Sequence, residues 1–261
     1  MKSFNFKSAT NTKEAAKLVS GRATFLAGGM SLLPAMKLRL AAYSDLINIK
    51  KIKTLSGIKV SSKSLRIGAT TTHASVASSK EVGKSIPSLA VLADGIGDPQ
   101  VRNRGTIGGS IANNDPAADY PSACLALNAT IHTSKRKISA DKFFKGMFET
   151  DLKKGELIES VEFEIPEKSA YAKYPNPASR YAVVGVYVAK LKNEVRVAVT
   201  GAASCVFRSK ELEASLSNNF SASAIDSVNI SNKGLNSDIH ASAEYRAHII
   251  KVMTKKAVSS C

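Results

Sequence analysis

The chain carries a glycine-rich stretch, residues 95–119, that is too long for an ordinary connection. Connections without secondary structure that exceed about 12–15 residues are uncommon in compact domains and usually have a function. At its centre, residues 105–110 read GTIGGS, which offers backbone donors, a hydroxyl on each side and two adjacent glycines that permit the close approach of a ligand. We therefore expect this stretch either to have a function or to be wrongly assigned as a structureless loop.

A second turn of the same kind lies about 80 residues earlier. The apolar run 23–27 leads into Gly28-Gly29-Met30-Ser31, and helical spacing resumes at Leu32. Free N–H groups and a hydroxyl between a strand and a helix suit a phosphate group. Either turn alone is most often only a tight turn, and neither matches G-x-G-x-x-G or a P-loop. Two such turns suggest one extended, phosphate-bearing cofactor held at several points.

Composition narrows the class of protein. With 261 residues, 44% of them hydrophobic and 22% charged, the chain is typical of a globular protein with one large domain or two modest ones. No apolar run approaches the roughly 20 residues of a membrane-spanning helix, and the first residues do not resemble a signal peptide, so a cytoplasmic location is expected.

The net charge of +16 raises nucleic acid or an acidic partner as a binding target. The basic residues, however, are scattered in pairs and triples without a long block, which favours a solvated basic surface over a nucleic-acid footprint. A partner subunit of opposite charge would explain the excess equally well.

The metal-binding residue types do not cluster along the chain. Cys124, Cys205 and Cys261 are far apart and form no C-x-x-C pair, and the four histidines form no H-E-x-x-H motif. We therefore predict free thiols, no metal site and no iron–sulfur cluster in this chain.

Periodicity and turn signals predict a mixed sequence of elements. A capping pattern of Asn11 and Glu14 predicts the start of the first helix. The expected strands are 4–6, 23–27, 45–49, 57–60, 65–69, 181–191 and 195–205, and the expected helices follow Asn11 and Leu32 and span 72–79, 88–94 and 241–257. The opening is βαβ-like, residues 181–205 form an antiparallel hairpin, and Tyr174-Pro175-Asn176-Pro177 predicts a domain boundary near 168–177.

Three motifs resemble the FAD-binding medium subunit of molybdenum hydroxylases, a family that includes the flavoprotein subunit of carbon monoxide dehydrogenase and the flavin domain of xanthine dehydrogenase. Residues 27–34 look like the family's A-G-G-x-S-L-L-P motif, and residues 104–119 look like its T-I-G-G-N-x-x-x-x-D-P-x-x-D motif. Residues 177–186 are similar to the start of its C-terminal domain. The resemblance runs end to end, and the three motifs stand in the family's order.

The resemblance implies an α+β fold. A two-part FAD-binding domain of the vanillyl-alcohol-oxidase (PCMH) type would span residues 1–170, with subdomains 1–55 and 56–170, and a smaller α+β domain would span 171–261. It also implies FAD as the cofactor and two partners, a molybdenum-cofactor large subunit and a [2Fe-2S] small subunit, in a heterotrimer or a dimer of heterotrimers.

The resemblance further implies which residues contact FAD, and it assigns no catalytic side chain. Residues 27–31 would lie at the pyrophosphate, residues 106–110 along the cofactor, Asp119 on a polar part of it and Lys173 near the flavin. Ile96 and Ile158 would pack near the rings. The implied set is Ala27, Gly28, Gly29, Met30, Ser31, Ile96, Thr106, Ile107, Gly108, Gly109, Ser110, Asp119, Ile158 and Lys173.

Met30 and Ser110 replace residue types that are common in the family, so backbone contacts are expected to matter most at these two positions. Two alternatives stay open. Asp119 precedes an apparent helix start, so it could be a plain N-cap, and Lys173 could simply be exposed.

The implied activity is electron transfer through FAD from the iron–sulfur clusters of a partner to an acceptor, because a flavin supplies its own redox chemistry. The rivals are a stand-alone FAD oxidoreductase and a basic, non-catalytic protein that binds nucleic acid or serves as a scaffold. The chain also lacks the cysteine-bearing insertion of the related hydroxybenzoyl-CoA reductase subunit, which disfavours that relative.

Overall fold

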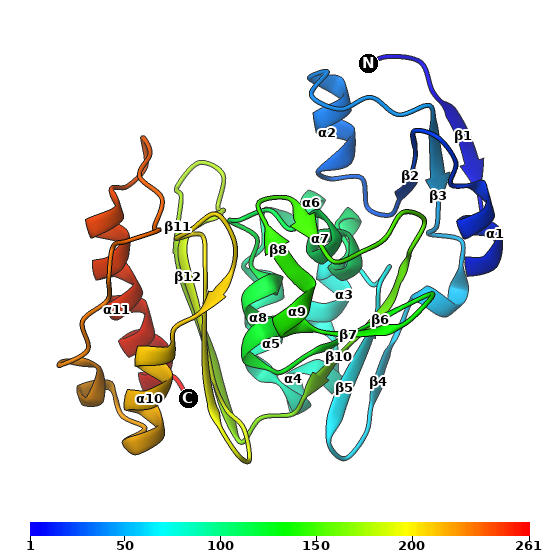
Figure 1. Cartoon of the computed structure of the whole chain (residues 1–261). Helices are drawn as coiled ribbons and strands as arrows, with labels where there is room; N and C mark the ends of the chain where they lie inside the picture. The colour runs from blue at the N-terminus through cyan, green and yellow to red at the C-terminus, as the bar shows by residue number, and fades with distance from the viewer.

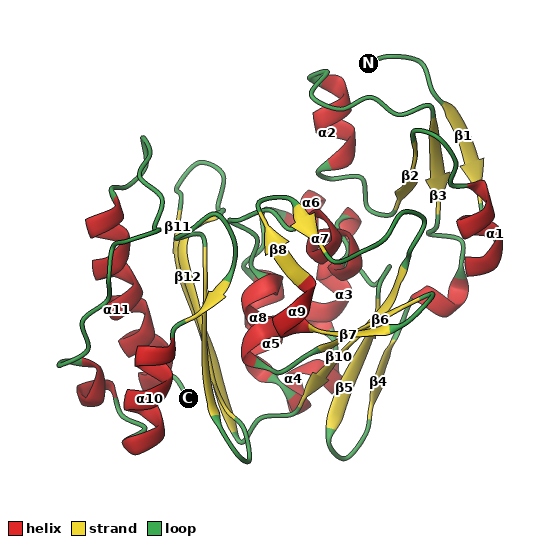
Figure 2. Ribbon diagram, viewed as in Figure 1, coloured by secondary structure: helices red, strands yellow, loops and turns green.

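The computed structural model describes all residues, 1–261, and the chain begins with a small parallel sheet (Figures 1 and 2). Its strand order is β1-β3-β2, with one helix in each crossover, as the βαβ-like pattern predicts. The bounds are β1 Asn5–Ser8, α1 Thr12–Leu18, β2 Ala23–Leu26, α2 Leu32–Lys37 and β3 Asp45–Asn48. The predicted cap is present, because the side chain of Asn11 accepts a hydrogen bond from the N–H of Glu14 at 2.9 Å.

The middle of the chain forms an antiparallel five-stranded sheet with the order β4-β5-β10-β6-β7. Strand alternation sends Leu65 and Ile67 into the core and leaves Arg66 on the other face. The strands are β4 Ile58–Val60, β5 Ser64–Gly68, β6 Thr130–Thr133, β7 Lys137–Ser139 and β10 Ile158–Glu164, and a two-stranded ribbon is formed by β8 Phe144–Gly146 and β9 Glu149–Thr150.

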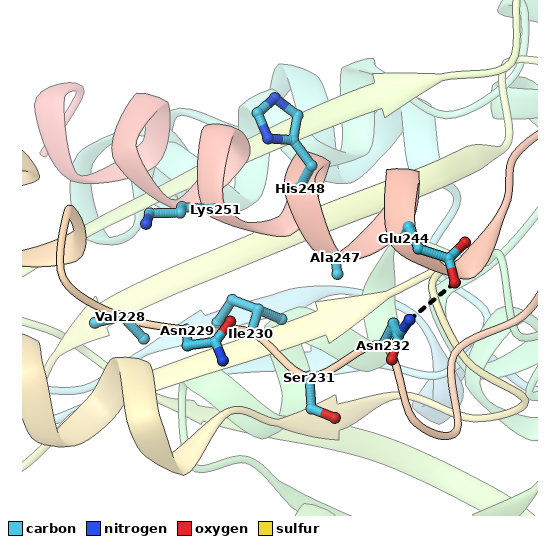
Figure 3. Close-up of a pocket in the computed structure, with 9 residues that line it drawn as sticks. All are labelled: Val228, Asn229, Ile230, Ser231, Asn232, Glu244, Ala247, His248 and Lys251. Atoms are coloured by element: carbon cyan, nitrogen blue, oxygen red, sulfur yellow. Dashed lines mark hydrogen bonds between the residues drawn. The ribbon is translucent and has the colours of Figure 1, made fainter.

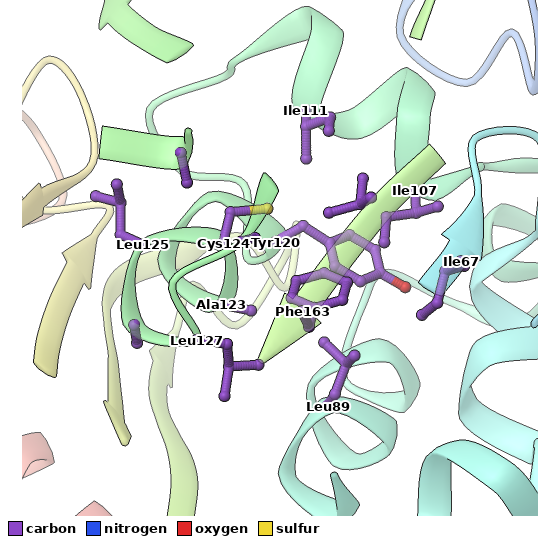
Figure 4. Packing of buried hydrophobic residues seen from close by; sticks show 14 of the residues in the cluster. Ile67, Leu89, Ile107, Ile111, Tyr120, Ala123, Cys124, Leu125, Leu127 and Phe163 are labelled. Atoms are coloured by element: carbon purple, nitrogen blue, oxygen red, sulfur yellow. The ribbon is translucent and has the colours of Figure 1, made fainter. Parts of the chain in front are cut away.

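Short helices cover the apolar face of this sheet, and Tyr120, Phe143 and Phe163 are fully buried among them. Figure 4 labels Tyr120 and Phe163 among the residues of this core. The helices are the 3-10 helix η1 Lys53–Leu55, α3 His73–Ser78, α4 Lys80–Ser85, α5 Pro87–Asp94, α6 Pro99–Arg104, α7 Ile107–Asn113, α8 Tyr120–Ala126 and α9 Ala140–Phe143.

The last third is an antiparallel sheet, β11-β12-β13-β14, that is covered on both faces. α10 and α11 cover one face, and α5 and α8 of the middle region pack on the other (Figure 1). Ser88 of α5 bonds to Tyr187 of β12 and to Ser169 of β11, both at 2.6 Å. The bounds are β11 Lys168–Pro175, β12 Ala182–Lys190, β13 Val195–Thr200, β14 Phe207–Arg208, α10 Lys210–Asn218, the 3-10 helix η2 Ala222–Ile225 and α11 Ala243–Ser259.

The segment expected to separate two domains is itself a strand. β11 begins at Lys168 and ends at Pro175, so a boundary at residue 170 falls inside it. Ala170 and Ala172 point into the C-terminal core, while Tyr171 between them packs against the core of the middle region. The prolines end this strand at the edge of its sheet, where a missing N–H is tolerated.

The glycine-rich stretch 95–119 is not a long loop, because it contains α6 and α7. Asp98 caps α6 and Thr106 caps α7, each through its side chain. Asn114 ends α7 in the left-handed conformation, with φ of 44°. No helix in the structure is long and apolar enough to cross a membrane.

Candidate cofactor site

The fold brings the two glycine turns into direct contact. A side-chain carbon on Gly28 would collide with the carbonyl oxygen of Arg104 and would lie 2.8 Å from the Cα of Gly105. One built on Gly109 would lie 4.0 Å from the Cβ of Ala27. The turns therefore pack backbone to backbone, which only glycine permits at Gly28.

The first turn presents free hydrogen-bond donors. The N–H groups of residues 28–32 have no acceptor within the protein, because they precede or begin α2. Ser31 is exposed and its hydroxyl makes no capping bond. Gly29 has φ of 76°, a conformation that favours glycine. Met30 is 37% exposed, and its backbone N–H is one of these free donors.

The second turn divides into a buried half and an open half. The N–H of Ile107 bonds to the carbonyl of Thr71 and that of Gly108 to the carbonyl of Ala69, so both point into the protein. Thr106 is 2% exposed and accepts a hydrogen bond from the N–H of Gly109.

Gly109 and Ser110 form the open half. Gly109 is exposed, and the Ser110 hydroxyl has no partner. Their own N–H groups are bonded to Thr106, so this half contributes the Ser110 hydroxyl and the bare surface of Gly109. Together with the free N–H groups of the first turn they make an open surface without side-chain bulk, which fits a pyrophosphate.

Asp119 occupies the N-cap position of α8, but its side chain does not cap the helix. Its carboxylate makes no bond to the helix and instead accepts a hydrogen bond from the hydroxyl of Tyr171 at 2.5 Å. The same oxygen lies 3.0 Å from Nζ of Lys173. Burial raises the pKa of the Asp119 carboxyl, and Lys173 and Tyr171, which bond to its ionised form, oppose that rise.

Lys173 is not simply exposed, because only 11% of its side chain is accessible. Besides facing Asp119, its Nζ donates to the carbonyl of Gly95 at 2.7 Å and to that of Arg180 at 3.1 Å. Lys173 therefore joins the C-terminal sheet to the turn after α5.

The two isoleucines lie in different surroundings. Ile96 is half-buried in the turn that follows α5, next to the carbonyl bonded by Lys173. Ile158 is 3% exposed and packs inside the core of the middle sheet. The structure thus places Ile96 beside the turn carbonyl that Lys173 bonds, and Ile158 inside the core against which Ile96 packs.

Sequence reasoning missed Tyr171, Arg102 and Arg180, which all bond around this cluster. A signal for Tyr171 was present, because residues two apart on a strand share a face, and Tyr171 and Lys173 both reach Asp119. Nothing in the sequence connects Arg102 with Arg180.

A separate pocket of about 490 Å³ lies between residues 228–232 and α11 (Figure 3). Asn232 and Glu244 bond across it at 2.9 Å. None of the residues named above lines this pocket. No group of three or more histidine, cysteine, aspartate or glutamate side chains is placed to hold a metal ion.

Comparison with known proteins identifies the family of this fold. Residues 2–168 match the model described as the FAD binding domain in molybdopterin dehydrogenase. The chain is 36% identical to the glyceraldehyde dehydrogenase medium chain of Sulfolobus acidocaldarius over 97% of its own length and 96% of that protein's. It is 38% identical to the carbon monoxide dehydrogenase medium chain of Hydrogenophaga pseudoflava, over 71% and 69% of the two chains.

Solved structures agree with these sequence matches. A chain of the reconstituted carbon monoxide dehydrogenase from Oligotropha carboxidovorans superposes with a TM-score of 0.92 at 28% identity, covering 99% of this chain and 97% of that one. A chain of quinoline 2-oxidoreductase from Pseudomonas putida 86 gives 0.89 at 28% identity, with 100% and 98% covered. The implied α+β fold with a PCMH-type FAD domain is confirmed. The chain belongs to the FAD-binding family of the molybdopterin dehydrogenases.

Proposed function

We propose that this chain is the FAD-binding medium subunit of a molybdenum hydroxylase and that its two abutting glycine turns hold the cofactor. The supporting observation is the contact between these turns, which are far apart in the sequence, together with the free N–H groups of the first turn. FAD is the cofactor expected of the family to which the chain belongs. A stand-alone oxidase and a nucleic-acid-binding scaffold are not favoured by the relatives.

In this proposal the pyrophosphate lies on the free N–H groups of residues 28–32 and beside Gly109 and Ser110. Backbone donors suit this task because they are fixed before the anion arrives, and their partial positive charge attracts it. Thr106, Ile107 and Gly108 do not contact the cofactor in this proposal, and their buried hydrogen bonds hold the second turn in place. Asp119, Lys173 and Ile96 then lie near the flavin ring of the bound cofactor. Ile158 stabilises the hydrophobic core beneath the site and does not touch the cofactor.

The bound FAD supplies the redox chemistry by accepting electrons and passing them on. The protein binds the cofactor, fixes its orientation and surrounds it with charge. The [2Fe-2S] clusters and the molybdenum centre belong in this proposal to partner subunits, in a heterotrimer or a dimer of heterotrimers. The relatives are named for glyceraldehyde, carbon monoxide and quinoline, which supports placing substrate choice outside this subunit. The proposal includes the expected cytoplasmic location, which cell fractionation tests.

FAD titration of the purified full chain tests the proposal. The wild type is expected to bind one FAD and to show flavin absorbance. Gly109→Val should weaken binding at least about tenfold, because the new side chain fills the surface between the turns. Gly83→Val is the matched control, since a side chain there meets no other atom within 4 Å. Stoichiometric FAD in folded Gly109→Val would overturn the site assignment.

A further inference from the structure

Three successive carbonyl groups in the turn after α5 are each bonded by a cationic side chain. Lys173 Nζ donates to the carbonyl of Gly95 at 2.7 Å. Arg102 Nη1 donates to the carbonyl of Ile96 at 3.1 Å. Arg180 Nη1 donates to the carbonyl of Gly97 at 3.1 Å. All the acceptors of this turn are therefore oriented toward positive charge.

The three cations come from separate parts of the fold. Arg102 lies on α6, which leads directly into the second glycine turn. Lys173 lies on β11 of the C-terminal sheet, and Arg180 lies in the connection between β11 and β12. The turn is thus tied both to the glycine turn beside it and to the C-terminal sheet.

Lys173 is the centre of this arrangement. Its ammonium group has three N–H donors, and the structure gives it three acceptors, Asp119 Oδ1 and the carbonyls of Gly95 and Arg180. With all three donors used, Lys173 has none left for a cofactor. Its bond to the carbonyl of Arg180 also anchors a residue in the left-handed conformation, with φ of 61°.

We propose that Lys173, Arg102 and Arg180 form a cationic clasp that fixes the turn 95–97 at the flavin end of the site, and that Lys173 is a positioning residue rather than a flavin ligand. This inference rests on the proposed function, because it concerns the same cofactor site. A turn that is held in place before FAD arrives lowers the ordering cost of binding. The clasp also couples the C-terminal sheet to cofactor retention.

Lys173→Met tests the clasp, because methionine keeps most of the length of lysine and removes all three donors. Lys168→Met is the matched control on the same strand, at an exposed position an odd number of residues away and so on the opposite face. Lys173→Arg keeps the charge and the donors. Each full-length variant is titrated with FAD, its bound flavin is recorded by visible circular dichroism, and trypsin cleavage after Arg180 is timed.

We expect Lys173→Met to weaken FAD binding by about tenfold or more, as for the loss of charge-assisted hydrogen bonds. Its flavin dichroism should change and cleavage after Arg180 should accelerate. Lys173→Arg should restore most of the affinity, and Lys168→Met should match the wild type. Wild-type affinity, dichroism and cleavage in Lys173→Met would overturn the clasp.

Two further outcomes are distinguishable. If Lys173→Met does not fold, Arg180→Asn provides the second test, because asparagine tolerates the left-handed conformation and removes the bond to Gly97. It should then weaken FAD binding and change the dichroism, and unchanged values would reject the clasp. If the wild type itself binds no FAD, the proposed function fails rather than the clasp.

Discussion

Gly108 and Gly109 are neighbours in one turn, but they perform different tasks. A side chain on Gly108 would lie 2.5 Å from the Cβ of Ala69 and 2.7 Å from its carbonyl oxygen. Gly108→Val is therefore expected to prevent correct folding, whereas a side chain at Gly109 meets only the Thr106 hydroxyl, at 2.9 Å, and otherwise occupies the open surface. Circular dichroism and thermal melts of the two variants check this difference. A stable, natively folded Gly108→Val protein would contradict it.

Asp119→Ala is expected to reduce both stability and FAD affinity. The substitution leaves the ammonium group of Lys173 with one acceptor fewer in a site where only 11% of that side chain is accessible. Loss of a hydrogen bond to a charged group typically costs about 1.5–3 kcal/mol. Urea unfolding of the FAD-free variant gives the stability and a flavin titration gives the affinity. A loss of stability with unchanged FAD affinity would remove Asp119 from the site.

His73 is expected to make the stability of the protein depend on pH. Burial, together with the charge of Arg102, lowers its pKa from 6.5 to about 4, and its Nδ1 has no partner. His73 therefore binds a proton more readily in the unfolded chain than in the folded one. Its contribution to the free energy of unfolding is complete above pH 6.5 and is lost as the pH falls toward 4. The loss reaches about 3 kcal/mol at most.

His73→Phe keeps a buried ring of similar size and removes this titration. Unfolding free energies measured from pH 4 to 7 should therefore vary less in the variant than in the wild type. Parallel curves for the two proteins would contradict the assignment to His73.

At the level of elements, the regular strands were predictable because alternation and β-branched residues define them. The strands 182–190 and 195–200 lie inside the predicted hairpin. The helices α6 and α7 were not predicted, because α6 holds a single apolar residue, Val101, and α7 holds two adjacent glycines, so neither shows helical apolar spacing over several turns. Their signals were the capping residues Asp98 and Thr106. Likewise, Asp119 and Lys173 could be predicted as site residues from the sequence, but their hydrogen-bond partners could not, because those partners lie on distant elements.

The C-terminal sheet completes the hydrophobic core of the FAD domain, and removing the sheet tests whether the domain needs it. Tyr187, Ala189 and Ala198 are buried in the same core as α5 and α8. A chain of residues 1–167 ends before β11 and exposes that apolar face, so we expect it to aggregate or to bind a hydrophobic dye. Light scattering and dye fluorescence check this outcome. A monomeric 1–167 fragment with a cooperative melt would show instead that the FAD domain folds alone.

At the scale of the whole molecule, positive charge is concentrated at one end. Residues 1–63 carry 12 lysines and arginines against 2 acidic residues, a net charge of +10 out of +16. This region contains the parallel sheet and the first glycine turn. Such a surface accelerates association with an acidic partner and loses this effect as salt increases. The charge distribution thus agrees with a subunit that docks onto other proteins beside its cofactor.

The chain alone is expected to be a competent flavoprotein without hydroxylase activity. Hydroxylation of an aldehyde or a purine needs a metal centre that activates water, and this chain places no group of three or more metal-binding side chains together. Dithionite should therefore bleach the FAD-loaded chain, whereas candidate substrates should not. Adding molybdenum and iron–sulfur subunits should give substrate-dependent bleaching, at a rate that falls with salt. Substrate-driven bleaching of the metal-free chain by itself would favour a stand-alone oxidase, because the electrons would then enter the flavin without any partner.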